Sequence, residues 1–298
     1  MIKVKSITLL ALMALVFITS CKKDEETPVS TTGNLNMEIT GLEDLGSDFA
    51  YEGWIIVNGQ AVSSGVFEVD ASGNMSKTSF EVSLSDLNAA STYVLTIEPS
   101  PDSDPDPSSV HILAGDFDGA SASLSVAHSA ALGNDFMASI GGYILATPTD
   151  GGSDTNENSG VWWLDPTAGP GAGLDLPVLP AGWSYEGWAV VDGTPISTGR
   201  FISVTGADDS NIYSSTSAAG PPFPGEDLLM NAPGGLAFPT DLTGKTVVIS
   251  VEPQPDNSTA PFLLKPLVGV VPVDAIDHTP YQMTNNASNT NPIGMAKK

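Results

Sequence analysis

The stretch "YEGWIIVNGQAVSSGVF" at residues 51–67 returns as "YEGWAVVDGTPISTGRF" at residues 185–201, with nine of the seventeen positions identical. In each copy an apolar run ends in Asn-Gly (58–59) or Asp-Gly (192–193). These dipeptides tolerate a positive φ at both central positions of a type I′ turn, and a strand-like pattern resumes after them. The phrase therefore predicts a β-hairpin that the chain builds twice.

A second repeated block indicates that a larger unit is duplicated. The sequences "TYVLTIEP" at 92–99 and "TVVISVEP" at 246–253 predict strands that stop at a proline, which cannot donate a hydrogen bond to a sheet. In both copies the order Glu-Pro-x-Pro-Asp follows, at 98–102 and at 252–256. Between the two blocks the second copy gains a net twenty residues, which fall in the Pro/Gly-rich segment 204–240 and predict an inserted loop.

Short strands dominate the pattern, and helical periodicity is confined to a short turn near residues 84–91. The 30 glycines and 23 prolines are typical of strands joined by many turns. We therefore expect an all-β protein with two tandem Ig-like β-sandwich domains. The first repeat is predicted at 35–135 and the second at 140–276, including the 204–240 insertion, and residues 277–298 are expected to form a polar tail.

The N-terminus has the features of a secretion signal. Two lysines precede an apolar run at residues 7–18, which is shorter than the roughly 20 residues that span a bilayer. The run leads to Cys21, the only cysteine of the chain, and the whole segment resembles a bacterial lipoprotein signal. We expect residues 1–20 to be a signal peptide, Cys21 to carry the lipid and residues 21–34 to form a flexible tether. Ordinary signal-peptidase cleavage with an unmodified cysteine is the alternative.

The residues after Cys21, "KKDEE", resemble the surface-export signal of Bacteroidetes lipoproteins. They predict a lipid-anchored protein on the outer face of the outer membrane, with the periplasmic face as the alternative location. The formal net charge of −25 disfavours nucleic acid and anionic head groups as partners. Attachment to the membrane is therefore expected to come from the N-terminal lipid, because apolar burial of acyl chains needs no basic patch.

Together the two blocks resemble the extracytoplasmic C-terminal domain of the anti-sigma-K factor family. The resemblance rests on "LPVLPAG" at 176–182, on the Gly-x-x-x-Ser-x-Gly-x-Phe order of both phrases, and on strands that end in Ile-Glu-Pro or Val-Glu-Pro. It implies an extracytoplasmic β-sandwich module in two tandem copies. Family members join this module to a membrane helix and a cytoplasmic sigma-binding segment, neither of which is evident here, so anti-sigma activity and binding residues are not carried over.

No signature of catalysis stands out, and we expect a non-catalytic protein without catalytic, cofactor-binding or metal-binding residues. His111, His128 and His278 have no helical histidine partner, and no Gly-x-Ser-x-Gly or phosphate-binding loop occurs. Glu52 and Glu98 recur as Glu186 and Glu252. Paired carboxylates suit glycoside hydrolysis, but the two members of each duplicated pair lie in separate repeats, and the glutamates before the prolines are expected to face solvent.

Acidic loops at 102–107, 116–119 and 206–211 could hold Ca²⁺ through carboxylate oxygens, although none has EF-hand spacing. The alternative interpretation is that these loops are simply solvated. Calcium is thus the one cofactor that the sequence leaves open.

The tryptophans suggest a second interpretation of function. Strand alternation sends Trp162 and Trp163 to opposite faces, so one is expected in the core and the other at the surface or an interface. Trp54 and Trp188, on the duplicated strands, are expected to be core anchors. The sequence therefore predicts a non-catalytic envelope protein that binds, displays or supports an unknown envelope protein or glycan. The alternative is a carbohydrate-binding accessory lipoprotein.

Overall fold

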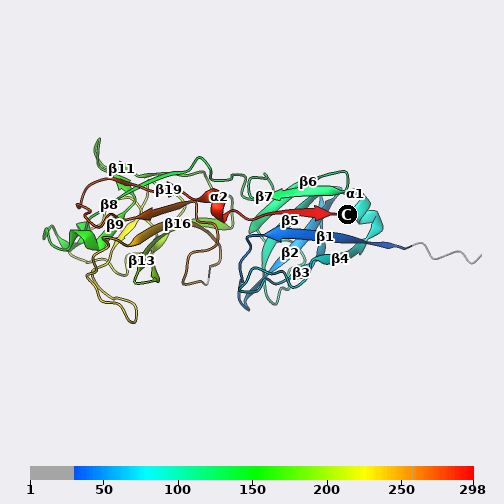
Figure 1. Ribbon diagram of the computed structural model, residues 1–298, viewed down its shortest axis with the longest axis horizontal. Helices are drawn as coiled ribbons and strands as arrows, with labels where there is room; N and C mark the ends of the chain where they lie inside the picture. Colours follow the sequence, from blue (N-terminus) through cyan, green and yellow to red (C-terminus); the bar gives the residue numbers. More distant parts are fainter. Residues whose placement is uncertain (1–29, 257) are drawn as a thin grey trace, which may run out of the picture. The chain divides into compact units, whose positions relative to one another are not determined.

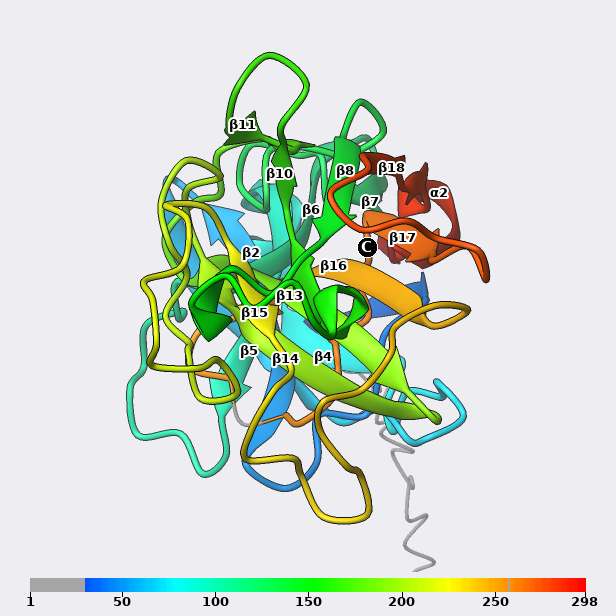
Figure 2. The same cartoon turned by 90° about the vertical axis from the view of Figure 1, so that its left-hand side faces the viewer.

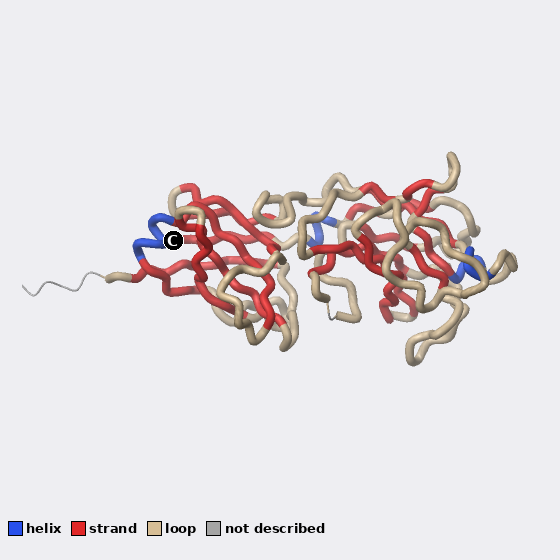
Figure 3. Tube along the Cα trace, turned by 180° about the vertical axis from the view of Figure 1, so that it is seen from behind, coloured by secondary structure: helices blue, strands red, loops and turns tan. Residues whose placement is uncertain are grey.

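The computed structural model describes residues 30–256 and 258–298, and residues Thr31–Lys298 form one compact unit. The expected signal peptide, Cys21 and most of the tether lie outside the described residues. Strands make up 42% of the chain and helices 6%, which confirms the predicted all-β class (Figure 3). Within the described residues, no helix is long and apolar enough to cross a membrane.

The first sheet has eight antiparallel strands in the order β3-β2-β5-β6-β7-β20-β1-β4. Its strands, with the short helix α1 between β4 and β5, are β1 (Thr32–Thr40), β2 (Phe49–Val57), β3 (Gln60–Phe67), β4 (Ser79–Ser83), α1 (Leu84–Ala89), β5 (Ala90–Pro99), β6 (His111–Asp118), β7 (Ser121–Ser125) and β20 (Ile293–Lys297). The outermost strands β3 and β4 contact each other. One continuous sheet therefore rolls around a core that includes Leu35, Tyr51, Phe80 and Leu95.

Both predicted hairpins have the expected turn. Asn58 and Gly59 have φ values of 52° and 81° between β2 and β3, and Asp192 and Gly193 have φ values of 51° and 83° in the second copy. Positive φ at both central residues defines the type I′ turn, whose twist matches that of the flanking strands. The repeated phrase is thus a hairpin, as its dipeptides predict.

The segment 277–298, predicted as a polar tail, is instead built into the sheets. It contains β18 (Tyr281–Gln282), β19 (Thr284–Asn285), α2 (Ala287–Thr290) and β20, and β20 lies between β1 and β7 (Figure 1). The side chain of β20 that is fully buried is Ala296, whereas Ile293 is 61% exposed. Because a small residue faces inward, β20 lacks the apolar alternation by which a strand is recognised.

The second copy of the hairpin belongs to a five-stranded second sheet, in the order β14-β13-β16-β17-β19. Figure 2 shows β14, β13 and β16 side by side. The new strands of this sheet are β13 (Trp183–Val191), β14 (Thr194–Phe201), β16 (Thr246–Pro253) and β17 (Leu267–Val270).

A third sheet covers the second, because Tyr143 of β8 packs at Gly269 of β17. Its order is β12-β8-β9-β15, with β18 paired to β8, and a two-stranded ladder joins β10 to β11. The remaining elements are β8 (Ile140–Leu145), the 3-10 turns Pro148–Asp150 and Glu157–Ser159, β9 (Gly160–Trp162), β10 (Leu164–Asp165), β11 (Gly171–Ala172), β12 (Leu174–Asp175) and β15 (Gly225–Asp227).

The inserted segment 204–240 is mostly loop, as expected, but it contributes β15 to the third sheet. Glu226 and Asp227 of β15 are fully buried. The hydroxyl of Ser214 donates to Glu226, and Thr149 donates to Asp227 through its backbone N–H at 2.9 Å and its hydroxyl. These donors satisfy the buried carboxylates, and those of Thr149 link the insertion to the 3-10 turn Pro148–Asp150.

Candidate functional site

The tyrosine of the repeated phrase anchors each hairpin. Tyr51 donates its hydroxyl to the Glu43 carbonyl at 3.0 Å and stacks on Phe67, with 5.5 Å between ring centroids. Tyr185 donates in the same way to the Pro177 carbonyl at 2.6 Å. In both copies the acceptor lies eight residues before the tyrosine, so this contact ties the preceding loop to the hairpin.

The glutamate and serine of the phrase are hydrogen bonded to each other across the hairpin. Ser63 donates to Glu52, and Ser197 donates to Glu186. Both glutamates are buried, with exposed fractions of 8% and 5%. The spacing of Glu and Ser in the phrase therefore reflects a paired contact within each copy.

Glu98 and Glu252, the second pair of duplicated glutamates, were predicted to face solvent, and this prediction is wrong. Their exposed fractions are 2% and 0%. On β2 and β5, Glu52 is opposite Thr96, two residues before Glu98. Opposite residues share a face of the sheet and so do residues two apart, so the two glutamates are diagonal neighbours. The position before a proline suggested an exposed strand end, but Glu98 is covered on the face of the sheet that it shares with Thr96, opposite to the face of Leu95 and Ile97.

In the first copy, several hydrogen-bond donors surround the buried carboxylate of Glu98. The Thr96 hydroxyl donates to Glu98, and the backbone N–H of Ser108 donates to Glu98 Oε1 at 2.9 Å and Oε2 at 3.1 Å. Trp54 Nε1 donates to Thr96 Oγ1 at 2.8 Å. Both carboxylate oxygens of Glu98 thus have a donor, although burial still raises the pKa of this carboxyl.

The second copy repeats the network with fewer donors. Glu252 Oε1 accepts from the Ser250 hydroxyl and from the Phe262 N–H at 2.9 Å, and Trp188 Nε1 donates to Ser250 at 2.7 Å. Within the described residues, Oε2 of Glu252 and Oε2 of Glu186 are buried without a hydrogen-bond partner. Burial raises the pKa of Glu186 to about 7 and is the main cause that raises the pKa of Glu252 to about 8, to which the negative charge of Glu186 also contributes.

Asp256 completes a cluster of three carboxylates. One oxygen from each of Glu186, Glu252 and Asp256 lies within 4.8 Å of the other two. Sequence reasoning missed this cluster, although the repeated Glu-Pro-x-Pro-Asp order placed Asp256 four residues after Glu252. The spacing of Glu252 and Asp256 was visible in the sequence, but the burial of the glutamates, on which the chemistry of the cluster depends, was not.

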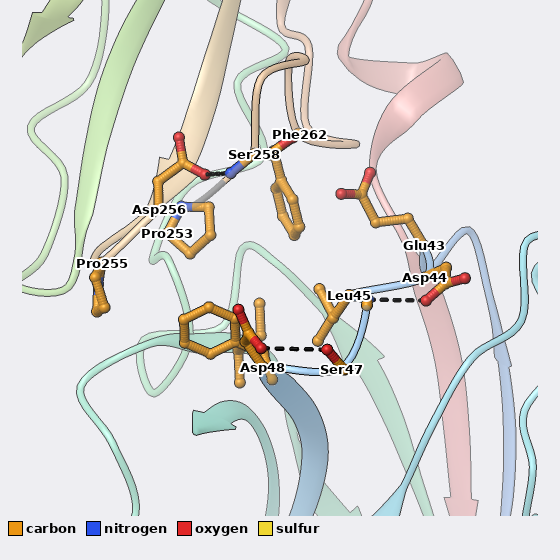
Figure 4. A pocket seen from close by; sticks show the side chains of 13 residues that line it. Glu43, Asp44, Leu45, Ser47, Asp48, Pro253, Pro255, Asp256, Ser258 and Phe262 are labelled. Carbon is orange, nitrogen blue, oxygen red and sulfur yellow. Dashed lines mark hydrogen bonds between the residues drawn. The ribbon is translucent and has the colours of Figure 1, made fainter. Parts of the chain in front are cut away.

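Asp256 also lines a pocket of about 400 Å³ (Figure 4). The other side of the pocket is formed by the loop 43–49, whose Glu43 and Asp48 carboxylates are labelled in the figure. Burial raises the pKa of Glu43 to about 7, while the positive charge of Lys265 acts in the opposite direction. The pocket therefore combines acidic groups with apolar walls such as Phe262.

The other residues singled out in the sequence lie in other environments. His111 Nδ1 is 2.9 Å from the Ala130 carbonyl, and His128 accepts from the Ala130 N–H at 3.1 Å. His278 pairs with the adjacent Asp277 at 2.9 Å. In the acidic loop 102–107 the aspartates accept hydrogen bonds from neighbouring backbone N–H groups, an arrangement typical of turns.

One of Trp162 and Trp163 was expected at the surface or at an interface; neither is at the surface, because both are buried, at 4% and 0%. Trp162 Nε1 donates to Asp227 at 2.8 Å, and the insertion covers its ring at Gly220. Trp163 lies on the opposite side, where it contacts Tyr143 edge-on. The strand alternation was right, but the insertion covers the face that was expected to be open. Trp54 and Trp188 are buried, as predicted.

The fold and these contacts define an all-β protein whose buried hairpin network occurs twice. Residues 28–111 match the family model described as anti-sigma-K factor rskA, C-terminal. This confirms the resemblance suggested by the motifs for the first copy of the repeat, which is similar to that domain from the tether to the start of β6. No curated protein and no solved structure matches the chain.

Proposed function

We propose that the chain is a non-catalytic, lipid-anchored envelope protein whose two anti-sigma-factor-like domains bind or display a partner outside the cytoplasm. The observation that carries this proposal is the position of the family match, which starts at residue 28, seven residues after the Cys21 that ends the lipoprotein-like segment. A match to this domain supports a regulatory or extracytoplasmic role. A lipid on Cys21 would place such a domain at a membrane surface.

The non-catalytic part of the proposal is supported by how the duplicated residues are used. Glu52 and Ser63 bind each other, Trp54 donates to Thr96, and Glu98 is held by two donors. These contacts lie within the first sheet or join it to the loop that carries Ser108, so the residues that recur most clearly support the fold. The pocket beside Asp256 is the cavity in which a ligand or a partner side chain would find both acidic and apolar contacts.

The carbohydrate-binding alternative relied on an exposed tryptophan that could stack on a sugar. All five tryptophans are buried, with exposed fractions between 0% and 4%. An envelope protein is therefore the favoured partner. Binding to a glycan array that is lost in a Trp162→Ala variant would reverse this preference.

The test of the anchor uses the full chain in its bacterial host, labelled with radioactive palmitate. We expect the wild type to incorporate label and to fractionate with the outer membrane, and Cys21→Ala to do neither. A matched control replaces residues 22–26 with alanine, which keeps Cys21 but removes the proposed export signal. This control should remain labelled and become protected from protease added to intact cells. An unlabelled, soluble wild-type protein would contradict the proposal.

A further inference from the structure

The geometry points to a binding site for a divalent cation of the Ca²⁺ type, formed by Glu186, Glu252 and Asp256. The site is distinct from the exposed acidic loops considered from the sequence, and it does not depend on the proposed lipid anchor. It lies at the end of the hairpin network in the second copy, where β16 leads into the loop that carries Asp256.

The strand register brings the two glutamates together. Glu186 of β13 is opposite Ser250 of β16, and Glu252 follows two residues later on the same face. One carboxylate oxygen from each of the three acids lies within 4.8 Å of the others. Ca²⁺ binds oxygen at about 2.3–2.6 Å, so two ligands on opposite sides of the ion are about 4.6–5.2 Å apart. A single ion can therefore reach all three carboxylates.

Unpartnered buried oxygens give independent evidence for a ligand. In each glutamate Oε1 is occupied by a donor, while Oε2 is buried without a hydrogen-bond partner within the described residues. Glu186 and Glu252 are only 5% and 0% exposed. Buried polar atoms in proteins are nearly always paired, and burying an unpaired carboxylate is unfavourable. A cation would be the missing partner of both oxygens.

The first copy provides an internal comparison. Glu52, Glu98 and Asp102 occupy the positions that correspond to the three acids of the site. There, the Ser108 N–H donates to both oxygens of Glu98, whereas Phe262, also ten residues after its glutamate, donates only to Oε1 of Glu252. The two copies therefore differ in two features that a cation requires: only the second copy leaves an oxygen of the second glutamate without a donor, and only there do the three acids lie within 4.8 Å of one another among the described residues.

The surroundings allow an ion to enter and to complete its coordination. Asp256 is half-buried and lines the 400 Å³ pocket, so water can supply ligands beyond the three carboxylates. The positive charge of Arg200 on β14 attracts the Glu186 carboxylate, but Arg200 also forms an ion pair with Asp209 at 3.2 Å. Lys265 interacts electrostatically with both Glu43 and Glu252.

The experiment is isothermal titration of the chelator-treated full chain with CaCl₂ at pH 8.5, together with melting curves with and without Ca²⁺. We expect one Ca²⁺ per chain and a higher melting temperature. Glu252→Gln and Asp256→Asn should each weaken binding at least tenfold. Asp256 is half-buried at the pocket, so its variant tests the site even where Glu252→Gln reduces stability. The matched control Glu98→Gln, in the first copy, should bind as the wild type does.

Three outcomes would overturn the proposal. The first is the absence of both heat and a melting shift in the wild type at pH 8.5, which would indicate that the two glutamates share a proton instead. The second is an equal loss in Glu98→Gln. The third is binding that survives in Asp256→Asn but disappears in Asp104→Asn, which would place the ion in the exposed loop. None of these results bears on the lipid anchor, which is tested by palmitate labelling.

Discussion

Gly53, inside the repeated phrase, occupies a position that has no room for a side chain. A Cβ at this position would overlap the hydroxyl groups of Tyr93 and Ser64. In the second copy, Gly187 has the same role against Thr198 and the indole of Trp163. The glycine before the tryptophan of each copy is therefore explained by the close approach of buried side chains, and not by an unusual φ.

We expect Gly53→Ala to lower the free energy of unfolding by about 2 kcal/mol, because the methyl group forces buried side chains to move. Gly206→Ala is the control, since a Cβ at Gly206 would meet nothing within 4 Å. It should change stability by less than about 0.5 kcal/mol. Urea denaturation followed by tryptophan fluorescence measures both, and equal effects would contradict this account of Gly53.

Individual residues could be predicted where local chemistry decides their role. The Asn58-Gly59 turn and the burial of Trp54 follow from turn preferences and from the usual place of tryptophan in a sandwich. The burial of Glu98 could not be predicted, because its donors include the N–H of Ser108, which lies ten residues away across a loop. Only the folded register shows that this carboxylate is satisfied inside the protein.

At the scale of elements, β20 is the strand on which the first sheet depends most directly. It forms ladders with β1 on one side and β7 on the other. Without it, both neighbours would present unpaired backbone groups, and open strand edges favour aggregation. The sequence did not predict β20, because its inward positions, Gly294 and Ala296, carry almost no apolar side chain.

Two substitutions on β20 test its contribution. Ala296→Asp places a charge at a fully buried position, and we expect it to lower the free energy of unfolding by about 3 kcal/mol. Ile293→Asp, three residues earlier at a position that is 61% exposed, should change it by less than about 0.5 kcal/mol. Chemical denaturation compares the two, and a stable Ala296→Asp variant would show that β20 is dispensable.

At the scale of the whole molecule, the buried acids control how stability depends on pH. Burial raises the pKa of Glu43, Glu186 and Glu226 to about 7, that of Asp208 to about 6 and that of Glu252 to about 8. In the unfolded chain these groups lose their protons near pH 4 to 5. Between the unfolded pKa values and the raised pKa values of the folded state, the folded protein holds more protons than the unfolded chain. Its stability therefore falls as pH rises through this range.

In the presence of a chelator, we therefore expect the free energy of unfolding to fall by at least about 2 kcal/mol from pH 5 to pH 8.5. Glu252→Gln should reduce this slope, because an amide cannot ionise. The exposed Glu68 provides the control, and Glu68→Gln should leave the slope unchanged. Urea denaturation at several pH values measures the dependence, and stability that rises with pH would contradict it.

The all-β class and the duplicated hairpins could be predicted because turns and strand patterns are local. The cluster of Glu186, Glu252 and Asp256 could not, since it arises from a diagonal register between two strands that are about sixty residues apart in the sequence. The burial of Trp162 also depends on a long-range contact, because the insertion covers its ring at Gly220. Long-range pairing decides which acids and which aromatic rings are removed from water.

The position of β20 has a consequence for the order in which the protein can assemble. Among the strands of the described residues, the ribosome makes β1 first and β20 last, yet the two lie side by side in one sheet. The first sheet can therefore close only after all the other strands have been synthesised. Until then, the seven earlier strands of this sheet remain an incomplete sheet. Insertion of β20 between β1 and β7 is then the step that completes it.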